Sequence, residues 1–256
     1  MRHADSSPDK LRMPIPKTNL FASNEAVAIA FADYLIHLLR KQEEIHIALS
    51  GGSTPKVLFR ILAEEYKEAV RWRNVHFWWG DERCVPPTDE ESNYKMTHDT
   101  FLKHIQIPDG NIHRIMGENE PELERDRIAA EARTSIPYYQ GRPRFDLIIL
   151  GMGSDGHTAS IFPHQMELLD SDQLFALATH PESGQQRITL TGKVINNARA
   201  IAFLVTGESK AGKIKEIFYQ QGNYKDYPAA HIHAIEGDLT WWLDDAAAVL
   251  TDIHQA

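Results

Sequence analysis

Apolar and polar positions follow two periods along the chain, and these periods predict strands and helices in turn. Four consecutive apolar residues, Leu147–Leu150, indicate a strand that is covered on both faces, because a half-exposed strand would alternate with polar residues. Between about 24 and 41, apolar residues recur at helical spacing, with Ser23 as the expected N-cap. A second helix is expected with Thr54 as its N-cap and Pro55 at its first position.

The remaining segments continue this alternation. Further strands are expected at 45–49, 75–79, 174–179, 187–190, 200–205 and 231–234. Further helices are expected near 92–103, 121–136, 191–198, 209–221 and 244–250. The order predicts a single α/β domain over 18–256, with a mostly parallel, doubly wound, Rossmann-like sheet and helices on both faces. Residues 1–17, which contain three prolines, are expected to be a tail or an edge segment.

Composition narrows the class of protein. With 256 residues, 42% apolar and 25% charged, the chain is typical of a globular protein with one large domain. A formal charge of −9 argues against binding to nucleic acid or to an anionic membrane. The single cysteine, Cys84, permits no internal disulfide, and no apolar run approaches the roughly 20 residues that span a bilayer. We therefore expect a cytoplasmic protein.

Ligands of a parallel sheet bind at the carboxyl ends of its strands, and these positions are rich in functional groups here. Ser50, Gly51, Gly52, Ser53 and Thr54 follow the strand at 45–49 and precede a helix. Backbone N–H groups and the positive end of the helix dipole favour a phosphate at such a loop, although a glycine turn with a helix cap explains the same residues. No Gly-Lys-Ser/Thr follows, so the loop is not of the Walker A type.

The segment Gly151-Met-Gly-Ser-Asp-Gly-His157 follows the buried strand and has two possible meanings. It fits the Gly-x-Gly-x-x-Gly pattern of dinucleotide-binding proteins, and it also presents Asp155 and His157 at a strand end. Pro163 leaves barely two helical turns after Gly156, whereas a dinucleotide fold needs a long helix there. Proton transfer is therefore the favoured interpretation.

Charged residues follow three other strands. Asp81, Glu82 and Arg83 come directly after the strand at 75–79, where solvated loop charges and catalytic groups are both possible. Arg187 and Lys210 would each be surface charges if taken alone. Combined with the 50–54 loop, they supply a guanidinium, an ammonium and backbone donors, which together suit a phosphate monoester.

These segments, in this order, resemble the 6-phosphogluconolactonases, which share a sugar-phosphate superfamily with the glucosamine-6-phosphate deaminases. The resemblance extends from about residue 20 to about residue 250. It is carried by Ser50-Gly-Gly-Ser-Thr-Pro55, Trp79-Gly-Asp-Glu-Arg83, Gly151-Met-Gly-Ser-Asp-Gly-His-Thr-Ala-Ser-Ile-Phe-Pro163, Arg187-Ile-Thr-Leu-Thr191, Thr206-Gly-Glu-Ser-Lys-Ala211 and Gly237-Asp-Leu-Thr-Trp-Trp-Leu-Asp244.

The resemblance implies hydrolysis of 6-phospho-D-glucono-1,5-lactone to 6-phospho-D-gluconate without a metal, nucleotide or other cofactor. His157 matches the general base, since an imidazole with a pKa of about 6.5 suits proton transfer near neutral pH. Asp155 would orient its ring or a substrate hydroxyl, and Arg83 would stabilise the oxyanion. Asp81 aligns with a catalytic acid of the deaminases, so its role here stays open.

The same resemblance assigns the other site residues. The phosphate-binding positions are Ser50, Gly51, Gly52, Ser53, Thr54, Arg187 and Lys210. Gly151, Gly153 and Gly156 would make room for the sugar lactone. A small-molecule lactone is the only partner expected, bound by a monomer or weak homodimer.

Two other functions compete with the lactonase. The deaminases continue the Asp-Gly-His core with Asn-Glu-Pro, and here Ile161-Phe162-Pro163 stands instead, so the supporting glutamate is replaced by Phe162. A sugar-phosphate sensor could use the same pocket without turnover, although the chain has no separate effector domain. His231 and His233 alternate along the expected 231–234 strand, and without clear further ligands no metal site is expected there.

Overall fold

A seven-stranded sheet forms the centre of the computed structural model, which describes residues 15–253. Its strands lie in the order β1-β12-β11-β8-β2-β3-β5, and every neighbouring pair is parallel. They are β1 (Thr18–Phe21), β2 (Ile45–Leu49), β3 (Val75–Trp79), β5 (Ile112–His113), β8 (Leu147–Leu150), β11 (Ala200–Val205) and β12 (Asp238–Asp244). The chain runs outward from β2 through β3 to β5, then outward from β8 through β11 to β12. The order therefore reverses between β2 and β8, and such a switch point opens a crevice at the carboxyl ends of the strands.

Two smaller antiparallel sheets accompany the central one. The first has the order β4-β10-β9, with β4 at Asp81–Arg83, β10 at Gln186–Leu190 and β9 at Phe175–Thr179. The second pairs β6 (Tyr138–Tyr139) with β7 (Arg142–Pro143). The expected strands at 174–179 and 187–190 are present, but they pair with each other and with β4 instead of joining the parallel sheet.

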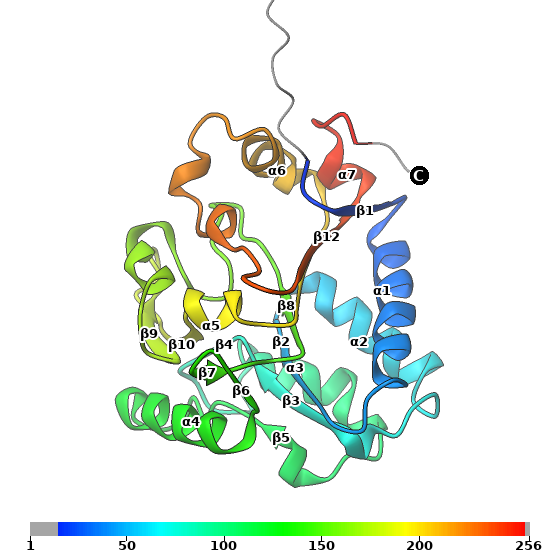
Figure 1. The fold of residues 1–256 in the computed structure, drawn as a ribbon, viewed down its shortest axis with the longest axis vertical. Helices are drawn as coiled ribbons and strands as arrows, with labels where there is room; N and C mark the ends of the chain where they lie inside the picture. Colours follow the sequence, from blue (N-terminus) through cyan, green and yellow to red (C-terminus); the bar gives the residue numbers. More distant parts are fainter. Residues whose placement is uncertain (1–14, 254–256) are drawn as a thin grey trace, which may run out of the picture.

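Helices cover both faces of the central sheet, as the alternating pattern predicts (Figure 1). On one side lie α1 and α2, while α5 and the β4-β10-β9 sheet lie on the other. The helices are α1 (Asn24–Leu39), α2 (Ser53–Glu65), α3 (Asn93–Thr100), α4 (Pro121–Ser135), α5 (Gly192–Asn196), α6 (Ala211–Phe218) and α7 (Asp245–Ala248). The single-domain, mostly parallel, doubly wound architecture is confirmed.

The apolar runs of the sequence become the core. Every residue of β2 and of β8 is buried, which confirms that the Leu147–Leu150 strand is covered on both faces. Ser23 accepts a hydrogen bond from the backbone N–H of Ala26 at 3.2 Å, so the expected N-cap of α1 is confirmed. The expected cap of α2 is wrong. Gly52, at a φ of 107°, is the N-cap instead of Thr54, whose hydroxyl contacts Thr206.

The expected strand at 231–234 is also wrong. A short 3-10 helix, Pro228–His231, precedes a loop that is fastened to Asn196. Asn196 accepts hydrogen bonds from the backbone N–H groups of His233 and Ile235, so these groups are not available to a sheet. The last strand is β12, which carries Trp241 and Trp242 as buried side chains.

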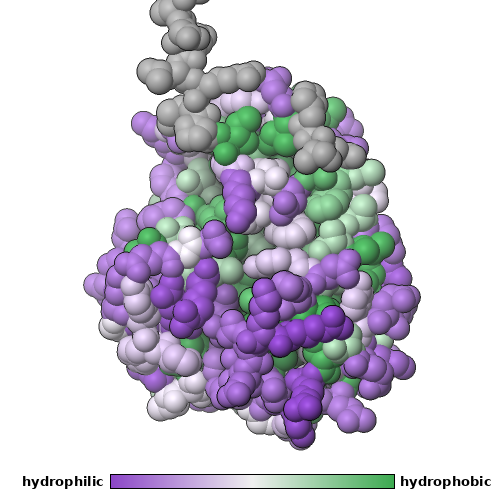
Figure 2. All heavy atoms as spheres, turned by 45° about the vertical axis from the view of Figure 1, so that its right-hand side comes forward, coloured by the Kyte–Doolittle hydropathy of each residue, from purple (hydrophilic) through white to green (hydrophobic). Residues whose placement is uncertain are grey.

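The face over α1 has an uneven surface. Figure 2 shows hydrophobic residues in its upper part and mostly hydrophilic residues in its lower part. The exposed large apolar side chains of the described residues include Ile29 of α1, and Val249 and Leu250 directly after α7. Within residues 15–253, no helix combines the length and the apolar character needed to cross a membrane.

Candidate active site

A cavity of about 220 Å³ lies at the carboxyl ends of β2, β3, β8 and β11, next to the switch point. The sequence-predicted residues that line it are Ser50, Gly51, Gly52, Ser53, Thr54, Asp81, Arg83, Gly151, Gly153, His157, Arg187 and Lys210. Two predicted residues, Asp155 and Gly156, are not part of the lining. The structure therefore brings predicted groups from five separate segments of the chain to one place.

His157 and Asp155 form a close pair beside the cavity. The Nδ1 atom of His157 lies 2.6 Å from Oδ1 of Asp155, which also accepts the backbone N–H of His157 at 3.1 Å. Burial opposes ionisation of Asp155, but the hydrogen bond and charge of His157 outweigh it, so the pKa of Asp155 falls to about 2. An ionised carboxylate only accepts hydrogen bonds, so Nδ1 carries the proton and Nε2 of the neutral ring keeps its lone pair.

Two glycines of this turn are required by neighbouring protein atoms, because a side chain at either position would clash with them. A Cβ atom on Gly153 would lie 2.2 Å from Nδ1 of His157 and 2.6 Å from Oδ1 of Asp155. Gly156 has a φ of 87°, and a Cβ atom there would lie 2.6 Å from the ring of Tyr227. The expectation that Gly156 makes room for the ligand is therefore wrong, because Tyr227 takes that room. Gly153 makes room for the His157–Asp155 pair and also lines the cavity.

Arg83 and Arg187 lie directly opposite each other on the antiparallel strands β4 and β10. Both line the cavity, and the Nε atom of each is buried without a hydrogen-bond partner among the described residues. Burial lowers the pKa of Arg187, and the positive charge of Arg83 adds to this effect while Asp81 opposes it. Like charges that face each other across a strand pair repel, so this arrangement is suited to binding an anion.

Asp81 and Glu82 are buried, so they are not the solvated loop charges that their position also permits. Asp81 accepts a hydrogen bond from the hydroxyl of Ser160 at 2.6 Å, and that hydroxyl accepts one from Arg187 at 3.4 Å. The Glu82 carboxylate accepts bonds from the backbone N–H groups of Arg83 and Asn93 at 2.8 Å each. Burial raises the pKa of Glu82, and these backbone donors oppose the rise. Glu82 thus fastens β4 to the start of α3.

The phosphate-binding candidates form the other side of the cavity. The Thr54 hydroxyl lies 2.7 Å from that of Thr206, which links the loop after β2 to the loop after β11. Burial lowers the pKa of Lys210, and the negative charge of Asp155 offsets part of the shift. Gly51 has no room for a side chain, since a Cβ atom there would lie 1.9 Å from Oδ1 of Asn93. The loop, Lys210 and the two arginines surround one space.

Phe162, which the resemblance aligns with a glutamate of the deaminases, is fully buried against His157. Its ring centroid lies 4.8 Å from that of His157, and the guanidinium carbon of Arg187 lies 5.5 Å from the Phe162 centroid. A phenyl ring accepts no proton, so the imidazole has Asp155 as its carboxylate partner. Phe162, the position at which this sequence differs from the deaminase motif, is therefore in direct contact with His157, the candidate base.

The sequence did not point to three residues of the site. Asn93 lines the cavity and donates to the backbone oxygen of Asp81, Ser160 joins Asp81 to Arg187, and Ala159 lines the cavity with a φ of 48°. A positive φ is strained for alanine, and strained residues gather at functional sites. Ser160 and Ala159 lie within the segment that carries the family resemblance, whereas Asn93 has no local signal because only the fold brings it to the cavity.

The chain matches known proteins over most of its length. Residues 21–241 match the family model described as glucosamine-6-phosphate isomerases/6-phosphogluconolactonase. The 6-phosphogluconolactonase of Haemophilus influenzae is 54% identical over 207 residues, which is 80% of this chain and 87% of that protein. The 6-phosphogluconolactonase of Aggregatibacter actinomycetemcomitans is 53% identical over 206 residues, with 80% and 87% covered.

A solved structure is similar over almost its whole length. The crystal structure of devB protein has a TM-score of 0.88 and 44% sequence identity, and the alignment covers 92% of this chain and 99% of that one. The match to the family model spans most of the chain, from the end of β1 into β12. The chain belongs to the glucosamine-6-phosphate isomerase/6-phosphogluconolactonase family.

Proposed function

We propose that this protein hydrolyses 6-phospho-D-glucono-1,5-lactone to 6-phospho-D-gluconate in the oxidative pentose phosphate pathway. Relatives that are more than half identical are 6-phosphogluconolactonases. The observation that carries the proposal is one cavity that holds an imidazole oriented by a carboxylate and two opposed arginines with unpartnered Nε atoms. A phosphorylated lactone needs both, because its ester must be hydrolysed while its dianion is held.

His157 is the general base of the proposed reaction. Its Nε2 atom takes a proton from water while the water oxygen forms a bond to the lactone carbonyl carbon. The carbonyl oxygen becomes an oxyanion. When the bond from this carbon to the ring oxygen breaks, the imidazolium returns the proton to the ring oxygen, which leaves as a hydroxyl group. The carboxylic acid so formed ionises into solvent, and His157 is neutral again.

The cationic groups have separate roles in this proposal. Arg83 stabilises the oxyanion, while Arg187, Lys210 and the Ser50–Thr54 loop bind the phosphate. Charge-assisted hydrogen bonds to a dianion stabilise the bound substrate, and they offset the repulsion between the two guanidinium groups. Asp155 acts through His157, whose tautomer it fixes. Asp81 holds Ser160 and thereby the guanidinium of Arg187, and we assign it no proton transfer.

The test is the rate of 6-phosphogluconolactone hydrolysis with purified protein, measured against the spontaneous rate. We expect acceleration at neutral pH that saturates with substrate. A rate equal to the spontaneous one would contradict the proposal. The protein would then bind the sugar phosphate without turning it over, as a sensor does. Calorimetric binding of 6-phospho-D-gluconate in the same preparation separates that outcome from a misfolded protein.

The deaminase activity of the family is tested separately. We expect no ammonia from glucosamine 6-phosphate, because Phe162 stands where the deaminases have a glutamate that supports the catalytic histidine during ring opening. A coupled assay for ammonia decides the point. Release at a rate comparable to lactone hydrolysis would overturn the assignment of Phe162 as the feature that selects the reaction.

We further propose that the protein works in the cytoplasm as a monomer or weak homodimer. The single cysteine suits a reducing compartment, and the charge of −9 disfavours polyanionic partners. Sedimentation over a range of concentrations tests the assembly, and a stable dimer at the lowest concentration would contradict it.

A further inference from the structure

A second group of polar side chains lies at the opposite end of the central sheet from the cavity. Glu44 directly precedes β2, and His46 and His76 are cross-strand partners near the amino ends of β2 and β3. We call these three residues the amino-end cluster. The cavity begins at Ser50, four residues beyond His46, which corresponds to roughly 13 Å along a strand. The cluster is therefore outside the proposed active site.

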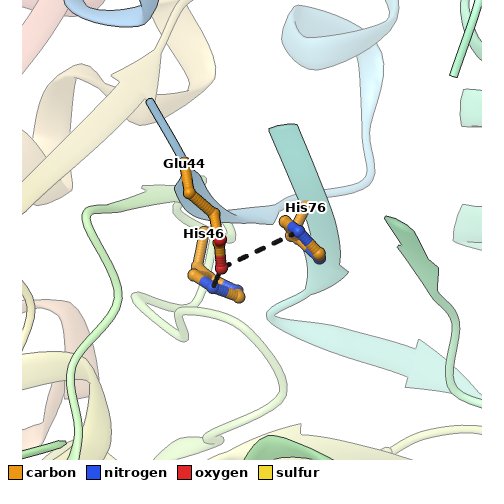
Figure 3. Close-up of side chains that lie close together, drawn as sticks. All are labelled: Glu44, His46 and His76. Atoms are coloured by element: carbon orange, nitrogen blue, oxygen red, sulfur yellow. Dashed lines mark hydrogen bonds and ion pairs between the residues drawn. The ribbon is translucent and has the colours of Figure 1, made fainter. Parts of the chain in front are cut away.

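The three side chains lie close together. Figure 3 shows the Glu44 carboxylate close to the imidazole of His46, with dashed lines to both His46 and His76. Oε1 of Glu44 lies 3.2 Å from Nε2 of His46 and 3.9 Å from Nε2 of His76, and one ligand atom of each residue lies within 4.8 Å of the others. Tetrahedral Zn²⁺ with bonds of about 2.0–2.1 Å holds its ligand atoms roughly 3.3 Å apart. The imidazoles of His46 and His76 stack with ring centroids 4.6 Å apart, so binding would have to draw the ligand atoms together and tilt the two rings toward the ion.

A chain of hydrogen bonds fixes the tautomer of His76 so that its Nε2 lone pair faces Glu44. Nδ1 of His113 lies 2.6 Å from Oε1 of Glu131, and Nε2 of His113 lies 2.9 Å from Nδ1 of His76. Hydrogen bonds from His113 and Arg127 hold the pKa of Glu131 low, so its carboxylate accepts the Nδ1 proton of His113. Nε2 of His113 then accepts the Nδ1 proton of His76. Nε2 of His76 consequently keeps its lone pair on the side of Glu44, as in carboxylate–histidine–metal arrangements.

His46 is less prepared to bind a metal ion. Its Nδ1 atom accepts a hydrogen bond from the indole N–H of Trp78 at 3.2 Å, so Nε2 of the neutral ring carries the proton and donates it to Glu44. A metal ion at Nε2 would require this proton to move to Nδ1, where it would face the indole N–H. The indole would lose its acceptor inside the core, and this loss opposes binding.

We propose that Glu44, His46 and His76 bind one divalent transition-metal ion of the Zn²⁺ class, with water as the fourth ligand. Two imidazoles and one carboxylate form a ligand set that such ions use. Glu44 has 62% of its side chain exposed and leaves a path for the ion. The ion fastens β2 to β3 and takes no part in hydrolysis.

The first experiment is a calorimetric titration of the metal-free full chain with Zn²⁺, repeated with Co²⁺ to detect tetrahedral d–d absorption. We expect one tight site in the wild type, with affinity at least ten-fold weaker in Glu44→Gln and in His76→Gln. Glu43→Gln removes a neighbouring acid outside the cluster and should bind as the wild type does. The chain has 13 histidines, so sites elsewhere would persist in all four proteins. Equal binding by the wild type and both cluster variants would overturn the proposal.

A second variant tests the role of His46 without removing it. Trp78→Phe deletes the indole N–H and keeps an aromatic ring, so the Nδ1–H tautomer of His46 no longer faces a competing donor. We expect Zn²⁺ affinity to rise by about five-fold or more. Circular dichroism of the apo variant verifies its fold. Unchanged or weaker affinity in a folded Trp78→Phe protein would contradict the assignment of His46 as a ligand.

Lactonase activity separates this proposal from the proposed function. Glu44→Gln should hydrolyse the lactone at the wild-type rate, while the same Zn²⁺ concentration should raise the melting temperature of the wild type more than that of Glu44→Gln. A loss of lactonase activity in Glu44→Gln would contradict the structural role of the ion. Absence of lactonase activity in the wild type would leave the metal titration unaffected.

Discussion

Two histidine–carboxylate pairs, one beside the cavity and one at the edge strand β5, differ in what surrounds the second ring nitrogen. His157 and Asp155 are 2.6 Å apart, and so are His113 and Glu131. Nε2 of His113 is occupied by His76, and its side chain is 7% exposed. His157 lines a cavity that also contains Arg83 and is 26% exposed. A carboxylate that orients an imidazole therefore does not by itself make a general base, because the base also needs an open nitrogen beside groups that hold the substrate.

The two histidine–carboxylate pairs should differ most in the effect that loss of the histidine has on kcat. We expect His157→Ala to lower kcat by about 10²–10⁴-fold, which is the usual contribution of general acid–base catalysis. His113→Ala removes a similar pair and should leave kcat near the wild-type value. Steady-state hydrolysis with both variants, each verified as folded by circular dichroism, measures this. Similar losses in both would mean that the comparison does not identify the base.

Arg83→Ala tests whether the arginine that lies in the same cavity as His157 contributes to turnover. We expect kcat to fall by about 10²-fold with a smaller change in KM, because an oxyanion donor acts mainly in the transition state. Arg83 and Arg187 are cross-strand partners, so the alternative assignment has both arginines bind one group of the substrate. If Arg83→Ala instead raised KM and left kcat unchanged, both arginines would hold the phosphate.

Arg187→Ala and Lys210→Ala should each act on binding. Loss of a charge-assisted hydrogen bond to phosphate should raise KM about ten-fold, with a smaller effect on kcat. Arg199→Ala, at an exposed arginine outside the cavity, is the matched control. Initial rates over a range of substrate concentrations separate the two constants. A pure kcat defect in both variants would contradict their assignment.

Gly153→Ala tests the packing that holds the His157–Asp155 pair. The new Cβ atom would overlap Nδ1 of His157, so the ring must shift, and we expect a several-fold loss of kcat in a folded protein. Gly110→Ala is the control, since a Cβ atom there meets nothing within 4 Å. Equal activity of the two variants would show that the ring position tolerates displacement.

The smallest effect concerns stability against pH. The pKa of Asp155 in the folded protein is about 2, below its ordinary unfolded value of about 3.9. Its contribution is therefore complete above about pH 4 and is lost as the pH falls through 2. We expect the melting temperature of the wild type to exceed that of Asp155→Asn above pH 4, with the gap closing toward pH 2. A gap that is independent of pH over this range would contradict the assigned pKa.

Sequence periodicity predicted β2, β3, β8 and β11 of the central sheet, because parallel strands that are buried on both faces carry apolar runs such as Leu147–Leu150. It missed β1, β5 and β12 of the same sheet. It also missed β4, whose residues Asp81, Glu82 and Arg83 are all charged. Their burial depends on partners that are distant in sequence, among them β10 and the start of α3. The expected strand at 231–234 failed for a similar reason, since Asn196 holds that loop.

Most of the candidate site could be placed from the sequence, because parallel strands bring their carboxyl ends to one edge. His157, Arg83 and Lys210 all follow strands and all line the cavity. The sequence could not predict which side chains of the site contact one another. The opposition of Arg83 to Arg187 depends on the register between β4 and β10, and the link through Ser160 to Asp81 depends on side-chain packing.

The register of β4 against β10 has a further consequence. It places Arg83 and Arg187 directly opposite each other, and the charge of Arg83 lowers the pKa of Arg187, so the ligand-free fold retains a repulsion that a bound dianion would reduce. Phosphate esters should therefore act as thermal protectants, and the melting temperature in phosphate buffer should exceed that in chloride at equal ionic strength. The supply of sugar phosphate would then govern how long each molecule survives unfolding and proteolysis as well as how fast it works.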